Sequence, residues 1–501
     1  MRKIFLFVFS AVIAFSIKAQ NDNKIVIGKI DSVYSKILNE KRKIWVYTPD
    51  VTSGIPNKRY PVVYLLDGDA HFASVVGMIQ QLSQANGNSV YPEMIVVGIP
   101  NTDRTRDLTP THVTSDPPMM DSNSSKTSGG GENFVAFIEK ELMPHIDSVY
   151  ATEPYKILIG HSFGGLTVMN VLTNHTKLFN AYIAIDPSMW YDKEHFLKAT
   201  ETKLTEKKYD GIRLYIGIAN TMPERMTLDK MKKDTSSDTK HIRSIFTLDK
   251  FFKANPQNGL KYASKYYGDD NHGSVPLITE YDGLRFIFDY YRFNLTSKDF
   301  TDSSDELVTK LKNHYTLVSE EMGYKISPLE LSINALGYDA MSKKYYARSA
   351  ALFKMNIANY PNSSNVYDSY GDLLATEKDT LNAIANYKKA LAIQDNAATK
   401  QKLDVLEGKG AFKFTEQYLQ KYAGVFDFEG FSLTAKLQVK DGVLWASVPG
   451  QEDSQLIPLS PDTFTVKNKN GYIVHFEMDG DKVLGFTSTQ PNGTFKAHIR
   501  K

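Results

Sequence analysis

The stretch YKILIGHSFGG, residues 155–165, decides the fold class. It places the pattern G-x-S-x-G, here Gly160 to Gly164, directly after an apolar run typical of a strand and directly before LTVMNVLTNH, which is typical of a helix. On such a turn the serine hydroxyl is exposed, and the flanking glycines let strand and helix approach without side-chain clashes. The motif therefore predicts Ser162 as a nucleophile and the backbone N–H of Phe163 as a donor to a developing oxyanion.

The surrounding sequence alternates short apolar runs with longer amphipathic stretches, of which residues 132–150 are the clearest helical example. This alternation predicts an α/β fold of the α/β-hydrolase type, with a mainly parallel sheet and helices on both faces. The Ser-, Asn- and Gly-rich residues 121–132 predict a surface loop. Strands are expected at residues 43–49, 60–68, 93–100, 155–162, 181–188, 213–220 and 261–268.

A serine hydroxyl is a weak nucleophile and needs a general base. In this fold the catalytic residues follow the chain order serine, acid, histidine. His272 lies in YYGDDNHGSVP, a polar loop between the last expected strand and the final helix of the fold. We therefore predict His272 as the base, and we interpret His161, inside the serine motif, as structural.

The acid is expected on the loop NTMPERMTLD, which follows the strand RLYIGIAN. Glu224 is the prediction because it lies nearest to the strand end, and Asp229 is the alternative. A second oxyanion donor is expected after the strand YPVVYLLDG. There Gly68 permits a close backbone approach, and the N–H of Asp69 is the predicted donor.

The same loop offers another interpretation, since Asp67, Asp69 and His71 are also metal-ligand types. The serine motif supplies a nucleophile without a metal, so we predict no metal and no cofactor. Two further residues are candidates for substrate binding. Arg106 is predicted to hold an acidic or catecholate group of the substrate; the alternative is that it forms a structural salt bridge. Trp190 is predicted to form an aromatic wall of the pocket; the alternative is that it is a core aromatic residue.

Length and composition limit the classes of function. The chain has 501 residues, a formal net charge of +2 and no cysteine. These values exclude disulfides and a cysteine nucleophile, and they predict no nucleic-acid partner. Residues 1–19 combine Arg2 and Lys3 with the apolar run IFLFVFSAVIAFSI and a small residue, which predicts a signal peptide. The protein is therefore expected to be exported to the periplasm or the exterior of a bacterium; an uncleaved N-terminal anchor is the alternative.

The character of the sequence changes after residue 300. Residues 331–408 are helical and repeat with a period of 34, so that Gly337 matches Gly371 and Phe353 matches Tyr387. This period is typical of tetratricopeptide repeats, whose helices bind peptides or mediate self-association. From about residue 412, short alternating segments are separated by Asp-Gly and Asn-Gly, which predicts a small antiparallel β domain. The predicted divisions are 1–19, 20–300, 301–410 and 411–501.

Five motifs in this order, LLDGDAHF, DRTRDLTPTH, GHSFGG, DPSMW and DDNHGSVP, resemble the putative-esterase family of α/β hydrolases, and its siderophore-esterase branch most closely. The resemblance covers about residues 25–295. It implies a Ser–His–acid mechanism, with Ser162 and His272 at the matching positions. The branch usually carries a Gly-rich stretch ending in Glu where this chain has ANTMPE. The β-rich C-terminus resembles accessory domains of bacterial serine hydrolases.

The predicted function is a serine carboxylic-ester hydrolase that works through an acyl-enzyme. Its expected substrates are siderophore esters or lactones, or acyl groups of polysaccharides. A protein partner or self-association is expected through the tetratricopeptide-like repeats. The alternative is an inactive hydrolase fold that serves as a scaffold through the repeats and the β domain.

Overall fold

A computed structural model describes residues 24–49, 58–116, 120–407, 414–467, 469, 471–491 and 493–500 of the chain. The predicted signal peptide lies outside the described residues. The chain divides into two compact units, one of Met1–Arg292 with Glu321–Tyr324 and one of Phe293–Glu320 with Lys325–Lys501. In the described residues, no helix combines the length and apolar character needed to span a bilayer.

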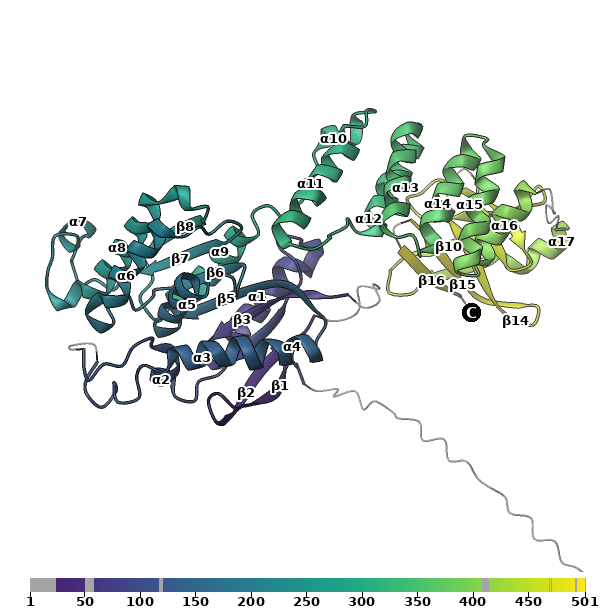
Figure 1. Ribbon diagram of the computed structural model, residues 1–501. Coiled ribbons are helices and arrows are strands. Elements are labelled where there is room, and N and C mark those ends of the chain that lie inside the picture. Colours follow the sequence, from purple (N-terminus) through teal and green to yellow (C-terminus); the bar gives the residue numbers. More distant parts are fainter. Residues whose placement is uncertain are drawn as a thin grey trace, which may run out of the picture. The chain divides into compact units, whose positions relative to one another are not determined.

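The first unit is built on an eight-stranded sheet with the order β1-β2-β4-β3-β5-β6-β7-β8 (Figure 1). Strands β4, β3, β5, β6, β7 and β8 are parallel to one another, and β2 and β1 are added antiparallel at one edge. The sheet is therefore mainly parallel, as predicted. The strands are β1 Lys29–Ser35, which the sequence analysis missed, β2 Glu40–Tyr47, β3 Tyr60–Leu66, β4 Ile95–Ile99, β5 Thr152–His161, β6 Ala181–Ile185, β7 Arg213–Ala219 and β8 Lys261–Tyr267.

Strands β3, β4, β6 and β7 are buried at every position, because helices cover both faces of the sheet (Figure 1). The predicted helix at 132–150 forms as two α-helices joined by a π-helical segment, Ile138–Leu142. The α-helices are α1 Gly68–Ser83, α2 Arg104–Leu108, α3 Gly131–Phe137, α4 Met143–Val149, α5 Phe163–Asn174, α6 His195–Glu206, α7 Leu228–Met231, α8 Lys240–Ala254 and α9 Val275–Ile287.

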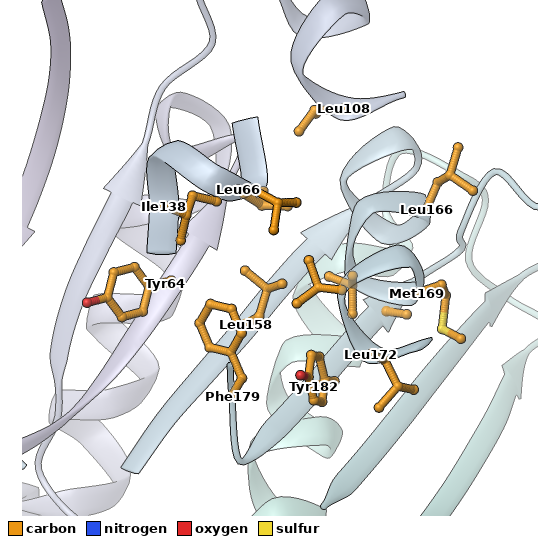
Figure 2. Close-up of a cluster of buried hydrophobic side chains, with 14 of the residues drawn as sticks. Tyr64, Leu66, Leu108, Ile138, Leu158, Leu166, Met169, Leu172, Phe179 and Tyr182 are labelled. Carbon is orange, nitrogen blue, oxygen red and sulfur yellow. The ribbon is translucent and has the colours of Figure 1, made fainter. Parts of the chain in front are cut away.

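Helix α5 is held against the sheet by a continuous apolar core, part of which Figure 2 shows. Tyr64 from β3, Leu158 from β5 and Tyr182 from β6 are fully buried, as are Leu166 and Leu172 from α5. Full burial of one such side chain contributes about 1.5–3 kcal/mol. The core thus fixes the helix that begins directly after Ser162.

The second unit begins with helices that repeat as the sequence predicted. Gly337 of α12 packs against the ring of Phe353 in α13, and Gly371 of α14 packs in the same way against Tyr387 in α15. Each matched glycine therefore leaves room for the matched aromatic ring. The helices are α10 Ser297–Thr301, α11 Glu306–Met322, α12 Glu330–Ser342, α13 Tyr346–Asn359, α14 Ser364–Thr376, α15 Thr380–Ile393, α16 Ala397–Leu406 and α17 Glu416–Leu419.

Helices α12 and α13 form a first hairpin and α14 and α15 a second, and further helices pack on both. Leu307 and Leu311 of α11 share a core cluster with Ile333 and Leu352 of the first hairpin. Helix α16 packs on the second hairpin through Leu403. These neighbours cover apolar faces that two repeats by themselves would leave exposed.

The C-terminal residues form a closed antiparallel β-barrel in which each strand pairs with the next and β16 returns to β9. The predicted order of domains along the chain is confirmed: an α/β fold, then repeating helices, then a small β domain. The exact domain boundaries stay predictions. The strands are β9 Gly424–Phe428, β10 Thr434–Lys440, β11 Val443–Ser447, β12 Ser454–Ser460, β13 Thr463–Val466, β14 Ile473–Asp479, β15 Lys482–Gln490 and β16 Gly493–Ile499.

Candidate active site

Ser162 occupies a strained turn between β5 and α5. Its backbone angles are φ 59° and ψ −114°, a region that residues with a side chain rarely adopt. The turn closes so tightly that a Cβ on Gly160 would lie 2.5 Å from the backbone of Gly164. The N–H of Ser162 donates to the carbonyl of Ile185 at 3.0 Å, which ties the turn to the end of β6. The backbone geometry predicted from G-x-S-x-G is therefore present.

The hydroxyl of Ser162 faces a pocket of about 380 Å³. Three histidines, His71, His161 and His272, line it together with Arg104. Ser162 Oγ lies 3.2 Å from the hydroxyl of the buried Ser188. Among the described residues, no hydrogen bond joins Ser162 Oγ to His272. Bonds of this kind commonly tighten only around a bound substrate.

His272 lies on the loop between β8 and α9, where the sequence placed it. Its Nδ1 is 2.6 Å from Asp186 Oδ2, and its side chain is 41% exposed. Because Nδ1 donates to a carboxylate, the proton of the neutral ring is on Nδ1 and Nε2 is left to accept one. His272 thus has the tautomer that a general base for Ser162 requires.

The acid that holds His272 is Asp186, and this corrects the prediction of Glu224. The Glu224 side chain is 89% exposed and its ion pair, at 3.6 Å, is with Arg225. The alternative, Asp229, is 93% exposed and lies 3.9 Å from Lys232. Glu224 lies on the loop after β7 and Asp229 lies in the short helix α7. Both side chains are exposed to solvent, and neither forms a hydrogen bond with His272.

Asp186 directly follows β6, one strand closer to Ser162 than the loop that carries Glu224. Its side chain is completely buried, and Oδ1 accepts the N–H of Ala219 at 3.0 Å. Burial alone would raise the pKa of the carboxyl. The hydrogen bonds from His241 and His272 outweigh burial, and the pKa lies well below its ordinary value. Asp186 is therefore an anion at neutral pH.

His241 is a second histidine on the same carboxylate, and the sequence analysis did not identify it. It lies on α8 and is almost fully buried, and its Nε2 is 2.8 Å from Asp186 Oδ2. The ring centroids of His241 and His272 are 5.1 Å apart. One oxygen of Asp186 thus accepts from two imidazoles at once. In the sequence His241 lies in a stretch with a helical pattern, and only the fold brings it to the end of β6.

The backbone donors predicted for an oxyanion lie beside the pocket. Phe163 is the first residue of α5, so its N–H has no acceptor within the helix. Asp69 is the second residue of α1 and lines the pocket. Gly68 begins α1 so close to β4 that a Cβ there would lie 2.6 Å from the N atom of Ile99. Only glycine allows this approach, which brings the N-terminus of α1 to the pocket. The roles of Phe163 and Asp69 remain predictions.

Asp67 stabilises the pocket wall. Its buried carboxylate accepts Arg104 Nε at 2.7 Å and Nη2 at 3.0 Å, and Asn101 Nδ2 at 2.7 Å. Burial raises the pKa of Asp67, but the bonds and charge of Arg104 bring it below its ordinary value. Arg104 also donates to the carbonyl of His161 at 3.2 Å. Asp67 is therefore committed to orienting Arg104 against the serine turn.

The two residues predicted to bind substrate have structural contacts instead. Arg106 pairs with Glu40 and Asp107, both at 2.7 Å. Trp190 is 4% exposed and packs against Phe163, with ring centroids 5.9 Å apart. Neither is among the described residues that line the pocket. The salt-bridge and core-aromatic alternatives fit these contacts, and Arg104 is the arginine of this segment that reaches the pocket.

The far side of the pocket carries a second histidine–carboxylate pair. His71 Nδ1 is 3.5 Å from Glu280 Oε1, and Glu280 is completely buried. The hydroxyl of Ser74 donates to Oε2 at 3.1 Å, but Oε1 has no hydrogen-bond donor among the described residues. Burial raises the pKa of Glu280 to about 8. Glu280 is therefore protonated at neutral pH.

His161 lies between the two pairs. Its ring centroid is 4.5 Å from that of His272 and 5.8 Å from that of His71. Burial, together with the charges of the neighbouring histidines, lowers the pKa of His161 to about 4. A neutral His161 beside His272 adds no positive charge to the site at neutral pH.

Metal binding has one geometric candidate in the part of the chain that the structure describes. The ligand atoms of Asp186, His241 and His272 lie within 4.8 Å of one another. These atoms already form the two short hydrogen bonds to Asp186, so binding a metal would withdraw His272 Nδ1 from its acid. The ligand atoms of Asp67, Asp69 and His71 do not gather in this way. In addition, Arg104 and Asn101 already donate to the Asp67 carboxylate.

Three features define an α/β hydrolase: a sheet with this strand order, a serine on a strained turn after β5, and a carboxylate after β6 paired with a histidine after β8. The chain belongs to the Putative esterase family, whose sequence model matches residues 35–250. The match includes Ser162, Asp186 and His241 and ends before His272.

Named relatives agree with this family. Ferri-bacillibactin esterase BesA of Bacillus subtilis (strain 168) is 32% identical over 189 residues, which are 36% of this chain and 65% of that protein. A siderophore enterobactin esterase of Emericella nidulans is 26% identical over 272 residues, 50% of this chain and 88% of that protein. The crystal structure of an IroE-like serine hydrolase from Shewanella oneidensis is 30% identical and has a TM-score of 0.55, covering 66% of this chain and 98% of that one.

Proposed function

We propose that the chain is a serine esterase in which Ser162 forms the acyl-enzyme. The observation that carries this proposal is the geometry at the strand ends. Ser162 sits on a strained turn and faces the same pocket as His272, whose Nδ1 is held by the buried anion Asp186. A nucleophile, a base with a free Nε2 and an orienting carboxylate are the three parts that acyl transfer requires.

In the proposed reaction, His272 Nε2 takes the proton of the Ser162 hydroxyl as Oγ attacks the ester carbonyl. Asp186 keeps the ring oriented and stabilises the imidazolium that forms. The N–H groups of Phe163 and Asp69 receive the negative charge of the tetrahedral intermediate. His272 then protonates the leaving alcohol, and a water activated by the same nitrogen releases the acid.

For the substrate we propose a siderophore ester or lactone. The support is the set of relatives named above, of which one is a siderophore enterobactin esterase and another a ferri-bacillibactin esterase by name. The pocket is consistent with a polar substrate, because its lining includes His71, Asn101 and Arg104 besides the catalytic residues. Acyl groups on polysaccharides are the competing substrates. Export and protein binding through the helical repeats also remain proposals.

The test is a substrate panel with the full-length protein and its Ser162→Ala variant. The panel contains a catecholate trilactone, feruloyl and acetyl sugars, and nitrophenyl acetate. We expect the wild type to favour the trilactone in kcat/KM, and the alanine variant to lose about 10³-fold or more on every ester. Circular dichroism of the variant controls for folding. A folded alanine variant with wild-type rates would refute the serine mechanism, and a preference for the sugars would refute the substrate.

Chelation separates this mechanism from a metal-dependent one. Because Ser162 and His272 supply nucleophile and base, EDTA is expected to leave kcat unchanged. Loss of activity with EDTA that a divalent ion restores would favour metal catalysis. A full-length wild type that hydrolyses no ester in the panel would favour the scaffold alternative.

A further inference from the structure

The interior of the C-terminal barrel differs between its two ends. One end is filled by Tyr422, which follows α17 and enters the barrel before β9. Its ring centroid lies 5.0 Å from that of Phe464 and 4.6 Å from that of Phe476. Its hydroxyl donates to the carbonyl of Pro461, in the turn between β12 and β13. Aromatic rings therefore close this end as a packed core.

The opposite end is hollow because small residues occupy its inward positions. Ala446 on β11 pairs with Ser454 on β12, and Ala435 on β10 and Ser488 on β15 also face the interior. These four residues are among those that line a cavity of about 80 Å³. Eight-stranded barrels are just wide enough to be filled by side chains or to hold one small ligand. In this barrel, side chains fill one end and leave space for a small ligand at the other.

The cavity has apolar walls and a polar mouth. Phe428, Leu456 and Phe486 form part of the wall, while Gln451 and Gln490 lie where the connecting turns reach the mouth. Its volume is well below the 300–1,000 Å³ of pockets for drug-sized molecules. The cavity therefore suits one ring or a short acyl chain, with a polar end left at the mouth.

Lys469 supplies the charge at this mouth. Its Nζ donates to Ser454 Oγ at 3.3 Å and lies 5.6 Å from the ring centroid of Tyr472. The ion pairs between described residues include none to Lys469. Glu452 is the one carboxylate among the described lining residues, and it is exposed to solvent. A half-buried ammonium group beside an apolar cavity favours a ligand with an anionic end.

We propose that the barrel binds a small organic acid. Its apolar body, a single ring or a short acyl chain, occupies the cavity between Ala446 and Ser488, and its carboxylate meets Lys469. The proposal does not depend on the esterase mechanism, since no residue of the pocket around Ser162 takes part.

The experiment is calorimetric titration of the full-length protein with benzoate and with benzyl alcohol, its neutral analogue. For a ligand of this size we expect a Kd of about 1 mM or tighter for benzoate, and weaker binding of the alcohol. Ala446→Phe fills the cavity and is expected to raise the Kd for benzoate by at least about tenfold. Ser447→Phe is the matched control, because the neighbouring side chain points away from the interior, and it should leave the Kd unchanged.

Two further variants keep the test decisive. Ser488→Leu fills the cavity from β15 and replaces Ala446→Phe if that variant fails to fold. Lys469→Gln is expected to raise the Kd for benzoate about fivefold or more and to leave the Kd for benzyl alcohol unchanged, since only the acid interacts with the charge. Benzoate that does not bind at about 10 mM, or that binds equally to wild type, to the cavity-filling variant and to Lys469→Gln, would overturn the proposal. In the last case the acid would be bound elsewhere on the protein.

Discussion

Two buried acidic side chains each lie next to a pocket histidine, one on each side of His161. Asp186 holds His272 at 2.6 Å, and Glu280 lies 3.5 Å from His71. Both carboxylates are completely buried, yet the pKa of Asp186 lies well below its ordinary value and that of Glu280 is raised to about 8. One side of the pocket is therefore charged at neutral pH and the other is neutral.

The difference teaches that donors, rather than depth, decide the charge of a buried acid. Asp186 accepts from His272, His241 and the N–H of Ala219, whereas Glu280 accepts only from Ser74 among the described residues. Hydrogen bonds to the ionised form lower a carboxyl pKa, and desolvation without them raises it. Only the Asp186 side can orient a histidine and stabilise its positive charge.

The largest expected effect comes from replacing each acid with its amide. Asp186→Asn should lower kcat by about 10³–10⁴-fold, because the amide no longer fixes the tautomer of His272 or stabilises its charge. Glu280→Gln is the matched control, equally buried and equally isosteric, and it should lower kcat by no more than about threefold. Steady-state kinetics on nitrophenyl acetate measure both. Equal losses in the two variants would remove the distinction between the two sides.

The next effect is on stability and depends on pH. Since the folded-state pKa of Glu280 is raised to about 8, folded protein keeps this proton in a range where the unfolded chain has released it. The contribution of Glu280 is therefore fully present below pH about 4 and is lost as pH rises through about 8. We expect a loss of roughly 3–5 kcal/mol in the free energy of unfolding across this window.

Urea unfolding at several pH values compares this loss in wild type with that in Glu280→Gln, where the group no longer titrates. The variant should show a flatter dependence and be the more stable protein near pH 8. A wild type and variant with parallel stability curves would show that Glu280 ionises normally in the fold.

A smaller effect is expected at His241, which shares Asp186 with His272. His241→Leu removes one of the donors to the Asp186 carboxylate, so the carboxylate is held less firmly against His272. We expect kcat on nitrophenyl acetate to fall by about tenfold. Steady-state kinetics measure the loss.

His241→Gln retains an amide donor and is the control for this change. Its kcat should stay within about threefold of the wild type. If His241→Gln loses as much activity as His241→Leu, the donor to Asp186 is not what matters, and His241 serves the fold of α8.

The smallest effect is predicted for Glu224, the acid that loop position favours. Because its side chain is 89% exposed and paired only with Arg225, Glu224→Gln should leave kcat and KM within about twofold of wild type. The same assay on nitrophenyl acetate provides the measurement. A loss comparable to that of Asp186→Asn would mean that the loop closes over the site during turnover.

These contrasts also show what the sequence reveals. The turn that carries Ser162 and the loop that carries His272 could be predicted, because each lies in a short segment whose local pattern limits its conformation. The catalytic roles of the two residues stay predictions. Asp186 also follows an apolar strand, in DPSMW, but its role depends on which strand end lies beside the histidine loop. That choice is made by the packing of parallel strands, which local patterns do not encode.

His241 and Glu280 were beyond sequence reasoning for a related reason. Both lie on helices whose sequence pattern is typical of ordinary amphipathic helices. Their importance comes from burial and from distant partners: Asp186 is 55 residues from His241, and Ser74 is 206 residues from Glu280. The repeats were predictable, since Gly337 and Gly371 match at the same spacing as their ring partners. The hollow end of the barrel was not, because it depends on small residues from several strands meeting at one level.

The central claim is that Ser162 is the nucleophile, and active-site phosphonylation tests it most directly. Wild-type protein treated with a fluorophosphonate is digested, and the modified peptide is mapped by mass spectrometry. We predict one adduct per chain, on Ser162, appearing in step with the loss of esterase activity and slowed strongly in the His272→Ala variant. Full inactivation with the adduct on another residue, or ester hydrolysis that persists after Ser162 is modified, would contradict the account.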